Sequence, residues 1–543
     1  MFSKSKINLE KDYLCPRNNR MDKDILQFDV SYEESPVLYA ERLGIMYAAN
    51  DKNDGKKKKG QFFTPSAIAF FMAQRVVCNK KKVRILDPGC GLAILSCALI
   101  QKLCSSDVLK EIELDLYEND LNIKTALQQS LSYLASWLSH RGVQLYYTVN
   151  ANDFVLENYQ VLDKTPSLLD TATLTYDYII SNPPYFKLSK DDLRAKAAAA
   201  IVDGQPNIYS LFMAIASKML IPEGRLLFIV PRSFASGRYF RLFRNYFFKA
   251  VELRFVHLFN TRKETFQKDG VLQETLILEC VPRIDKTNAA EVLLSSSGGI
   301  FDLDKPFQKI YAASDLIDIT STEKILYLPV SQQEDDVIKL FNSWVGSLEK
   351  YGIKISTGPV VAFRAKEAIT MEKTENAAPL YWLHNVVKML TGHPVENKEK
   401  GQWIQIDKCA KSMLIPNKNY VFLRRFSSKD DRSRLVASPY LAGSSPSRLI
   451  GVENKLNYIY RPGGHLSRTE VIGLSAILNS KIFDTYFRTF NGNVNVSASE
   501  LREMPMPPIE AINEIGEKLI SGNDLTEEKA SYIVSEYFKV KTI

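Results

Sequence analysis

The sequence lacks any apolar run long enough to cross a membrane. Its 543 residues are 45% hydrophobic and 24% charged, which is ordinary for a globular protein. No stretch approaches the roughly 20 apolar residues of a transmembrane helix. The N-terminus also lacks the apolar core of a signal peptide. We therefore expect a cytoplasmic protein with no membrane partner.

Paired cysteines are missing as well. The seven cysteines are an odd set, and no two of them stand in a CxxC spacing. In a cytoplasmic chain this pattern predicts reduced thiols, with neither disulfides nor a metal site.

The length of 543 residues exceeds what one hydrophobic core usually holds, so we expect two or three domains. The net charge of +8 permits a polyanionic partner but does not establish one.

A strand, a glycine-rich turn and a helix are predicted in succession. The turn Pro88-Gly89-Cys90-Gly91-Leu92-Ala93 joins the strand 83–87, which ends in Asp87, to the helix 94–103. This is the nucleotide-binding half of a doubly wound sheet, in which glycines let the backbone approach a ligand. The third glycine of a dinucleotide fingerprint and a phosphate-binding lysine are both absent. The turn therefore favours a small nucleoside ligand over a dinucleotide or ATP.

Acidic residues stand at the ends of the next two predicted strands. Glu118 ends the strand 111–118 and precedes Asn119, and Asp153-Phe154 follows the strand 145–149. A carboxylate at such a strand end can accept hydrogen bonds from both ribose hydroxyls. Asp153 could bind the amino group of an adenine whose ring lies against Phe154. Each carboxylate alone could be a solvated loop residue, but three such strand ends in succession indicate a nucleoside site.

Thr64 and Pro65 precede an apolar helix predicted over 67–77. Threonine is a good N-cap and proline favours the first helical position, so capping is the simplest interpretation. The free N–H groups of a helix N-terminus could also hold a carboxylate.

The motif Asn182-Pro183-Pro184-Tyr185 follows the apolar strand 176–180. Two prolines remove two N–H donors and stiffen the turn, so the nearby carbonyl groups and the Asn182 side chain stay available as acceptors. Tyr185 adds a flat aromatic face. Alone, the motif is most simply a proline-rich turn, but beside a nucleoside site it suits a planar ring with an exocyclic amino group.

Strands and helices alternate as far as residue 282, which predicts an α/β fold with a doubly wound, mostly parallel sheet. Ligands bind such sheets at the carboxyl ends of the strands, where the residues above lie. Afterwards the alternation is lost, and a mixed α+β region follows, with an amphipathic helix over 474–491. The predicted divisions are an N-terminal arm at 1–35, a first domain at 36–285, a second at 286–510 and a helical tail at 511–543.

Basic and aromatic residues are interleaved between positions 411 and 468. Acidic residues among them leave an ordinary solvated surface open, but interleaving across a whole domain suits a nucleic acid better. The candidates for contact with the nucleic acid are Arg424, Arg425, Lys429, Arg432 and Arg434.

A site for a nucleoside without phosphates, next to a turn whose acceptors can bind an amino group, points to methyl transfer from S-adenosyl-L-methionine to an amino nitrogen. The lone pair of an adenine amino group is delocalised into the ring. Acceptors at Asn182 and the Pro183 carbonyl would free it for attack, through positioning and preorganised acceptors alone. The base has to leave the stack, and Tyr185 and Phe266 would hold its two faces.

The chain resembles the gamma class of adenine-N6 DNA methyltransferases, the modification enzymes of type II restriction systems. The resemblance rests on Gln61–Pro65, Asp87–Gly91, Glu118, Asp153 and Asn182–Tyr185, in that order. The second half resembles the PstI/BsuBI-type subgroup in the stretches 357–364, 423–429 and 478–502. Leu92-Ala93 departs from the family, which usually has a Ser-Gly pair there, and 491–495 matches only in part.

The resemblance implies a catalytic domain followed by a target recognition domain, with S-adenosyl-L-methionine as cofactor and double-stranded DNA as partner. A separately encoded restriction endonuclease is a further partner to expect, and we expect a monomer. The cofactor-binding residues would be Phe63, Thr64, Pro65, Asp87, Gly89, Cys90, Gly91, Glu118, Asn119, Asp153 and Phe154. The catalytic residues would be Asn182, Pro183, Pro184 and Tyr185, with Phe266 as the second stacking face.

Two other functions stay open. Because the Asn-Pro-Pro-Tyr motif serves any planar amine or amide, the substrate could be RNA adenine or a protein glutamine, although such enzymes seldom carry a large basic second domain. A non-catalytic DNA-binding specificity subunit is the alternative outside enzymes, and the intact motif argues against it.

Overall fold

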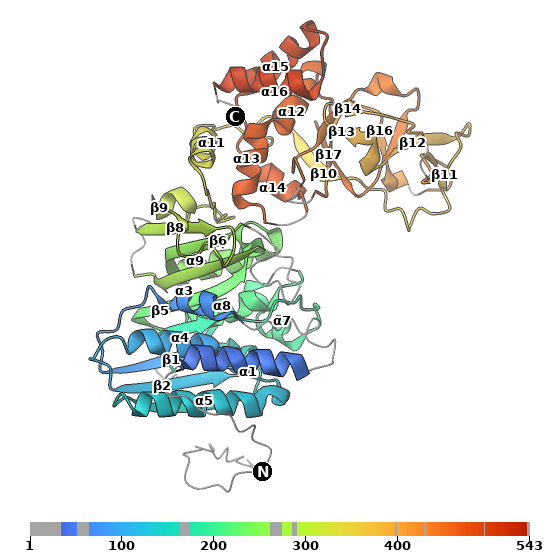
Figure 1. Cartoon of the computed structure of the whole chain (residues 1–543). Coiled ribbons are helices and arrows are strands. Elements are labelled where there is room, and N and C mark those ends of the chain that lie inside the picture. The colour runs from blue at the N-terminus through green and yellow to red at the C-terminus, as the bar shows by residue number, and fades with distance from the viewer. Residues whose placement is uncertain are drawn as a thin grey trace, which may run out of the picture. The chain divides into compact units, whose positions relative to one another are not determined.

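The computed structural model describes residues 34–50, 64–162, 174–202, 204–260, 274–284, 290–396, 399–409, 411–427, 431–492 and 495–539. These form two compact units (Figure 1). The first comprises the chain up to Phe234 and Tyr239–Lys324, and the second comprises Ala235–Arg238 and Ile325–Ile543. The arm predicted at 1–35 lies almost entirely outside the described residues.

The first unit is built on one sheet in the order β3-β2-β1-β4-β5-β7-β6-β8-β9. Strands β1 to β5 pair in parallel with one another, and β6 pairs in parallel with β8, whereas β7 runs antiparallel to β5 and β6 and β9 runs antiparallel to β8. The predicted doubly wound, mostly parallel α/β fold is therefore confirmed. The strands are β1 Lys82–Pro88, β2 Glu111–Tyr117, β3 Gln144–Asn150, β4 Tyr176–Ser181, β5 Leu220–Pro231, β6 Val251–Phe259, β7 Thr275–Pro282, β8 Glu291–Ser297 and β9 Phe307–Ala312.

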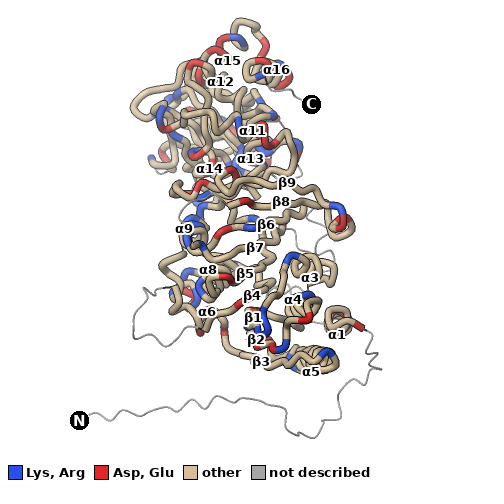
Figure 2. Tube along the Cα trace, turned by 90° about the vertical axis from the view of Figure 1, so that its left-hand side faces the viewer, with Lys and Arg blue, Asp and Glu red and all other residues tan. Residues whose placement is uncertain are grey.

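Helices cover both faces of this sheet (Figure 2). One face carries α1, α3, α4 and α5, whose apolar residues share a single core with β1 and β2. The other face carries α6, α8 and α9. The helices of the first unit are α1 Pro36–Asn50, α3 Ser66–Ala73, α4 Ile94–Leu103, α5 Lys124–Ser139, α6 Phe154–Asn158, α7 Leu193–Ala197, α8 Ile208–Ser217, α9 Arg241–Ala250 and α10 Ala313–Leu316.

The second unit is mixed α+β, as expected. The sheets among its described residues have the orders β10-β20-β17-β18, β11-β15-β12-β19-β16 and β13-β14. The strands are β10 Lys354–Thr357, β11 Ile369–Thr370, β12 Ala377–Tyr381, β13 Val386–Val387, β14 Leu390–Thr391, β15 Trp403–Gln405, β16 Leu414–Pro416, β17 Tyr420–Arg424, β18 Ala437–Tyr440, β19 Leu449–Val452 and β20 Leu456–Tyr460. The helices are α11 Gln332–Asn342, α12 Arg468–Asn479, α13 Lys481–Phe490, α14 Ala498–Glu503, α15 Ile509–Ser521 and α16 Glu527–Phe538.

Two predicted boundaries differ from the structure. The sheet of the first unit continues past residue 285, because β8 pairs with β6 and β9 with β8, and this unit ends at Lys324. The single helix predicted over 474–491 is two helices, because Ser480 is extended (φ −66°, ψ 149°) and its hydroxyl accepts a hydrogen bond from Phe483 N at the start of α13.

None of the helices in the described ranges is long and apolar enough to span a bilayer.

Candidate active site

The glycine-rich turn and the Asn-Pro-Pro-Tyr turn lie side by side. They follow β1 and β4, which are neighbouring parallel strands, so both turns leave the same edge of the sheet. The Ser181 hydroxyl donates to the Pro88 carbonyl. A Cβ atom at Gly89 would lie 3.8 Å from Cδ of Pro184. The structure therefore brings together the two motifs that the sequence placed nearly a hundred residues apart.

The turn after β1 depends on left-handed backbone. Gly89 and Gly91 have φ angles of +79° and +58°, which glycine adopts without steric strain. The N–H groups of Gly89 and Cys90 both donate to the Tyr117 carbonyl at 2.9 Å. Ala93, which stands where the family usually has glycine, also has a positive φ of 61°. The backbone here thus takes the course that a glycine would allow, with an alanine in place.

Asp87 and Glu118 line this turn with two perturbed carboxyl groups. Asp87 is fully buried, and one oxygen accepts from Ser96 Oγ at 2.6 Å. Burial, opposed by Ser96 and reinforced by Glu118, raises the pKa of Asp87 to about 7. Its other oxygen, Oδ1, is buried with no hydrogen-bond partner among the described residues. A buried carboxylate oxygen of this kind is a strong candidate for a ligand contact.

Glu118 holds the turn in the structure. Its oxygens accept from the N–H groups of Gly91 at 3.0 Å and Asp120 at 2.8 Å, and burial raises its pKa. The neighbouring Asn119 is exposed. Burial also raises the pKa of the Cys90 thiol well above its usual value, so this thiol stays protonated.

Asp153 and Phe154 begin α6 at the end of β3. One oxygen of Asp153 accepts from the N–H groups of Val155 at 2.9 Å and Leu156 at 3.0 Å, which is an N-cap. Its other oxygen pairs with Arg194 at 3.4 Å. Phe154 is buried against Tyr117. The structure therefore gives both residues a local structural role as well.

The predicted capping role of Thr64 is wrong. Helix α3 begins at Ser66, Pro65 is the N-cap residue, and no side chain of the cap bonds to the helix. Instead Glu41 of α1 accepts a hydrogen bond from Ser66 N at 2.8 Å. A carboxylate does bind this helix N-terminus, but it comes from the protein. Thr64 is buried, and its Oγ1 accepts from Asn182 Nδ2 at 3.0 Å.

The Asn-Pro-Pro-Tyr turn is held from three directions. Besides the bond to Thr64, the Asn182 oxygen accepts from the Tyr185 hydroxyl. That hydroxyl also lies 2.8 Å from the Ile229 carbonyl oxygen on β5. The Tyr185 ring meets Tyr209 edge-on, with centroids 6.1 Å apart. The result is a fixed amide group at the sheet edge, adjoining the glycine turn.

The predicted DNA-contacting residues fall into different environments. Arg432 is exposed. Arg424 donates to the Val386 carbonyl and Arg425 to the Asn454 carbonyl, and both are partly buried. Arg434 is fully buried, so it is a structural residue and not a surface contact for DNA. Its guanidinium donates to Ser427 Oγ and Asn491 Oδ1 inside the second unit.

Three predicted site residues, Phe63, Phe266 and Lys429, lie outside the described residues.

Sequence reasoning missed several residues that shape the site. Ser96 was hidden in an apolar helix, where an isolated serine is the only local signal. Arg194 and Glu41 act from segments distant in the chain, and the Ile229 contact is made by a backbone carbonyl. These last three carry no signal in a single sequence.

Known proteins are similar in sequence to most of this chain. Residues 94–266 match the family model described as Eco57I restriction-modification methylase. The type II methyltransferase M.BsuBI of Bacillus subtilis is 32% identical over 473 residues, which are 86% of this chain and 91% of that protein. The type II methyltransferase M.PstI of Providencia stuartii is 28% identical over 494 residues, 91% of this chain and 96% of that protein.

Among solved structures, the type IIG restriction endonuclease BpuSI is similar over 92% of this chain and 68% of its own, with 12% identity and a TM-score of 0.43. At the level of class, the chain is a methyltransferase of the restriction–modification type. It belongs to the type II methyltransferase family, and the resemblance to the PstI/BsuBI-type modification methylases is confirmed.

Proposed function

We propose that this protein is a site-specific DNA methyltransferase that transfers a methyl group from S-adenosyl-L-methionine to the N6 amino group of an adenine. It would act as the modification enzyme of a restriction–modification system. The observation that carries the proposal is the fixed Asn182 amide, held between Thr64 and Tyr185 at the sheet edge that also carries the glycine turn.

The residues of this edge fit S-adenosyl-L-methionine. Asp87 Oδ1 is a buried acceptor without a hydrogen-bond partner in the described part of the chain, and Gly89 leaves a side of the turn free of Cβ. Glu118, which directly follows β2, has a carboxylate that can accept hydrogen bonds from both ribose hydroxyls. When bound, the cofactor supplies an electrophilic methyl group on a sulfonium. We assign its binding to Pro65, Asp87, Gly89, Cys90, Gly91, Glu118, Asn119, Asp153 and Phe154, with Phe63. The hydroxyl of Thr64, which the resemblance also implies for the cofactor, instead accepts a hydrogen bond from Asn182.

The chain's own residues would bind the base and free its lone pair. The Asn182 oxygen and the Pro183 carbonyl accept the two amino hydrogens, which draws the nitrogen toward a tetrahedral shape. Pro184 keeps the turn rigid. Tyr185 presents a ring to the base, which has to be turned out of the duplex first, and Phe266 is the proposed second face.

The second unit would recognise the target sequence in double-stranded DNA. Arg424, Arg425 and Arg432 remain the proposed contacts there, with Lys429, while Arg434 is excluded by its burial. A duplex site modified one strand at a time requires no second copy, so we propose a monomer that works beside a separately encoded restriction endonuclease.

The test is the Asn182→Ala protein, incubated with unmethylated genomic DNA and tritiated cofactor. We expect S-adenosylhomocysteine to bind as in the wild type, while methyl transfer falls by at least a thousandfold, because the acceptor for the amino group is gone. Asn342→Ala, at the exposed end of α11, is the matched control. Full activity of Asn182→Ala, or wild-type transfer to RNA or protein in place of DNA adenine, would contradict the proposal.

A further inference from the structure

Asn182 is held at both ends of its amide group. The nitrogen donates to Thr64 Oγ1 over 3.0 Å, and the oxygen accepts from the Tyr185 hydroxyl. An amide whose donor and acceptor ends are both engaged has one orientation. Its oxygen therefore faces Tyr185, away from Thr64. The orientation matters because only the oxygen can accept a hydrogen from an amino group.

Among the described residues, two acceptors lie within reach of the Tyr185 hydroxyl. One is the Asn182 oxygen, and the other is the Ile229 carbonyl oxygen at 2.8 Å. A hydroxyl carries a single hydrogen, so it serves one of the two at a time. Burial raises the pKa of Tyr185 well above its usual value, so the hydrogen is retained across the working pH range.

The Tyr185 ring packs against the ring of Tyr209. Tyr209 is fully buried, meets Tyr185 edge-on and lies with its own hydroxyl 2.9 Å from Ser233 Oγ. Turning the Tyr185 hydrogen from one acceptor to the other therefore needs only rotation about the C–O bond, with no movement of the ring.

We propose that Thr64 and Tyr185 are positioning residues that orient the Asn182 oxygen and leave it available to the substrate amine. This proposal rests on the proposed function. Thr64 sets the direction of the amide. The Tyr185 hydroxyl satisfies the oxygen before substrate arrives and turns its hydrogen to the Ile229 carbonyl when the amino group takes its place. The Asn182 oxygen then accepts a hydrogen bond from the amine.

Thr64→Val tests the first half, because it replaces the hydroxyl by a methyl group of the same shape. We expect the turnover number for methyl transfer to fall at least tenfold. The dissociation constant of S-adenosylhomocysteine, measured by calorimetry, should change less than threefold. Thr64→Ser restores the hydroxyl and should recover most of the turnover. Thr125→Val on the exposed side of α5 is the matched control.

Tyr185→Phe tests the second half, because it keeps the ring and removes the hydroxyl. We expect DNA affinity, measured by fluorescence anisotropy, to stay within threefold while turnover falls at least fivefold. Since both residues act through Asn182, the losses should not multiply: the Thr64→Val/Tyr185→Phe protein should lose less turnover than the product of the single losses.

The following results would contradict the positioning roles of Thr64 and Tyr185. A Thr64→Val protein with wild-type turnover overturns the inference. So does one whose affinity for S-adenosylhomocysteine falls as much as its turnover, which would make Thr64 a cofactor ligand. If thermal unfolding shows that Thr64→Val does not fold, Tyr185→Phe decides alone, and turnover within twofold of wild type overturns the inference. A wild-type protein that methylates no adenine overturns the proposed function, and this inference falls with it.

Discussion

At the scale of single residues, the raised pKa of Asp87 predicts that binding at the proposed cofactor site depends on pH. Its pKa is raised from 3.8 to about 7 in the folded protein. Between these values the folded chain keeps a proton that the unfolded chain has lost, so this group's contribution to stability falls as the pH rises through that window. A cationic ligand needs the carboxylate, which forms only toward neutral pH.

We therefore expect the affinity for S-adenosyl-L-methionine to rise with pH. Below a pKa of about 7, each pH unit lowers the carboxylate fraction by about tenfold, so calorimetry at pH 6 should give a dissociation constant about tenfold above that at pH 8. Asp87→Asn should flatten the profile. Because Ser96 lowers the pKa of Asp87, Ser96→Ala should move the midpoint to higher pH. An unchanged profile in Asp87→Asn would assign the titration to another group, such as Glu118.

At the scale of elements, what could be predicted follows from local patterns. The strand before Asn182 is a run of apolar, β-branched residues, and β4 covers Tyr176–Ser181. The carboxyl ends of parallel strands lie at the same edge of a sheet. Because Asp87 ends one predicted strand and Asn182 follows another, their proximity could be predicted from the sequence. Contacts between distant segments escaped prediction. Glu41 caps α3 in place of Thr64, and Arg434 is drawn into a buried polar network that its sequence neighbours do not reveal.

Helices α12 and α15 pack closely against each other through two glycines. A Cβ atom at Gly473 would lie 1.9 Å from the Ile512 carbonyl oxygen, and one at Gly516 would lie 2.2 Å from that of Thr469. The two glycines therefore let the helix backbones touch. Gly473→Ala gains about 1 kcal/mol in helix propensity, but overpacking against backbone should outweigh it and destabilise the second unit by about 2 kcal/mol net.

Urea denaturation of the Gly473→Ala protein measures this effect. The matched control is Gly443→Ala, because a Cβ there meets nothing within 4 Å. Its unfolding midpoint should stay at the wild-type value. A Gly473→Ala protein at least as stable as the wild type would show that α12 and α15 can separate at no cost, against the close approach of their backbones.

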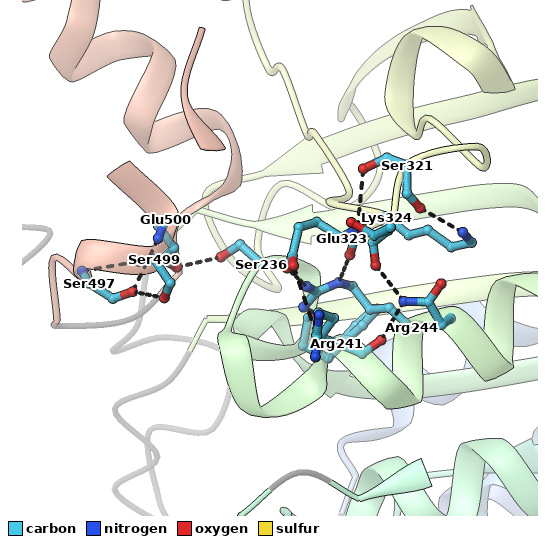
Figure 3. A network of polar contacts seen from close by, with 12 residues as sticks. Ser236, Arg241, Arg244, Ser321, Glu323, Lys324, Ser497, Ser499 and Glu500 are labelled. Atoms are coloured by element: carbon cyan, nitrogen blue, oxygen red, sulfur yellow. Dashed lines mark hydrogen bonds and ion pairs between the residues drawn. The ribbon is translucent and has the colours of Figure 1, made fainter. Parts of the chain in front are cut away.

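At the scale of the whole molecule, the chain passes from one unit to the other at few points. It leaves the first unit after Phe234, returns at Tyr239 and leaves again after Lys324. In the second unit, Ser236 Oγ donates to Glu500 over 3.0 Å, and Leu326 N donates to the Ala235 carbonyl over 2.9 Å. The segment Ala235–Arg238 is thus held in the second unit by the side chain of Ser236 (Figure 3) and by a backbone hydrogen bond.

Arg244 binds the chain close to both points at which it leaves the first unit, at Phe234 and at Glu323. This fully buried side chain on α9 donates to the Phe234 carbonyl at 3.1 Å, and to the carbonyl and a carboxylate oxygen of Glu323 at 2.7 and 3.3 Å (Figure 3). Arg244→Met keeps the length of the side chain but leaves these acceptors without their donor. Losing one partner of a buried pair costs about 3 kcal/mol, so we expect unfolding of the first unit at clearly lower urea concentration.

Arg241→Met is the matched control for Arg244→Met. Arg241 lies on the same helix and approaches the same Glu323 at 3.9 Å, but its side chain is 44% exposed. An exposed ion pair contributes at most about 1 kcal/mol, so the control should unfold close to the wild type. Tryptophan fluorescence and limited proteolysis report both variants, and cleavage near Phe234 and Glu323 should quicken only in Arg244→Met. Equal midpoints for the two variants would mean that the hydrogen bonds of Arg244 to Phe234 and Glu323 contribute little to the stability of the first unit.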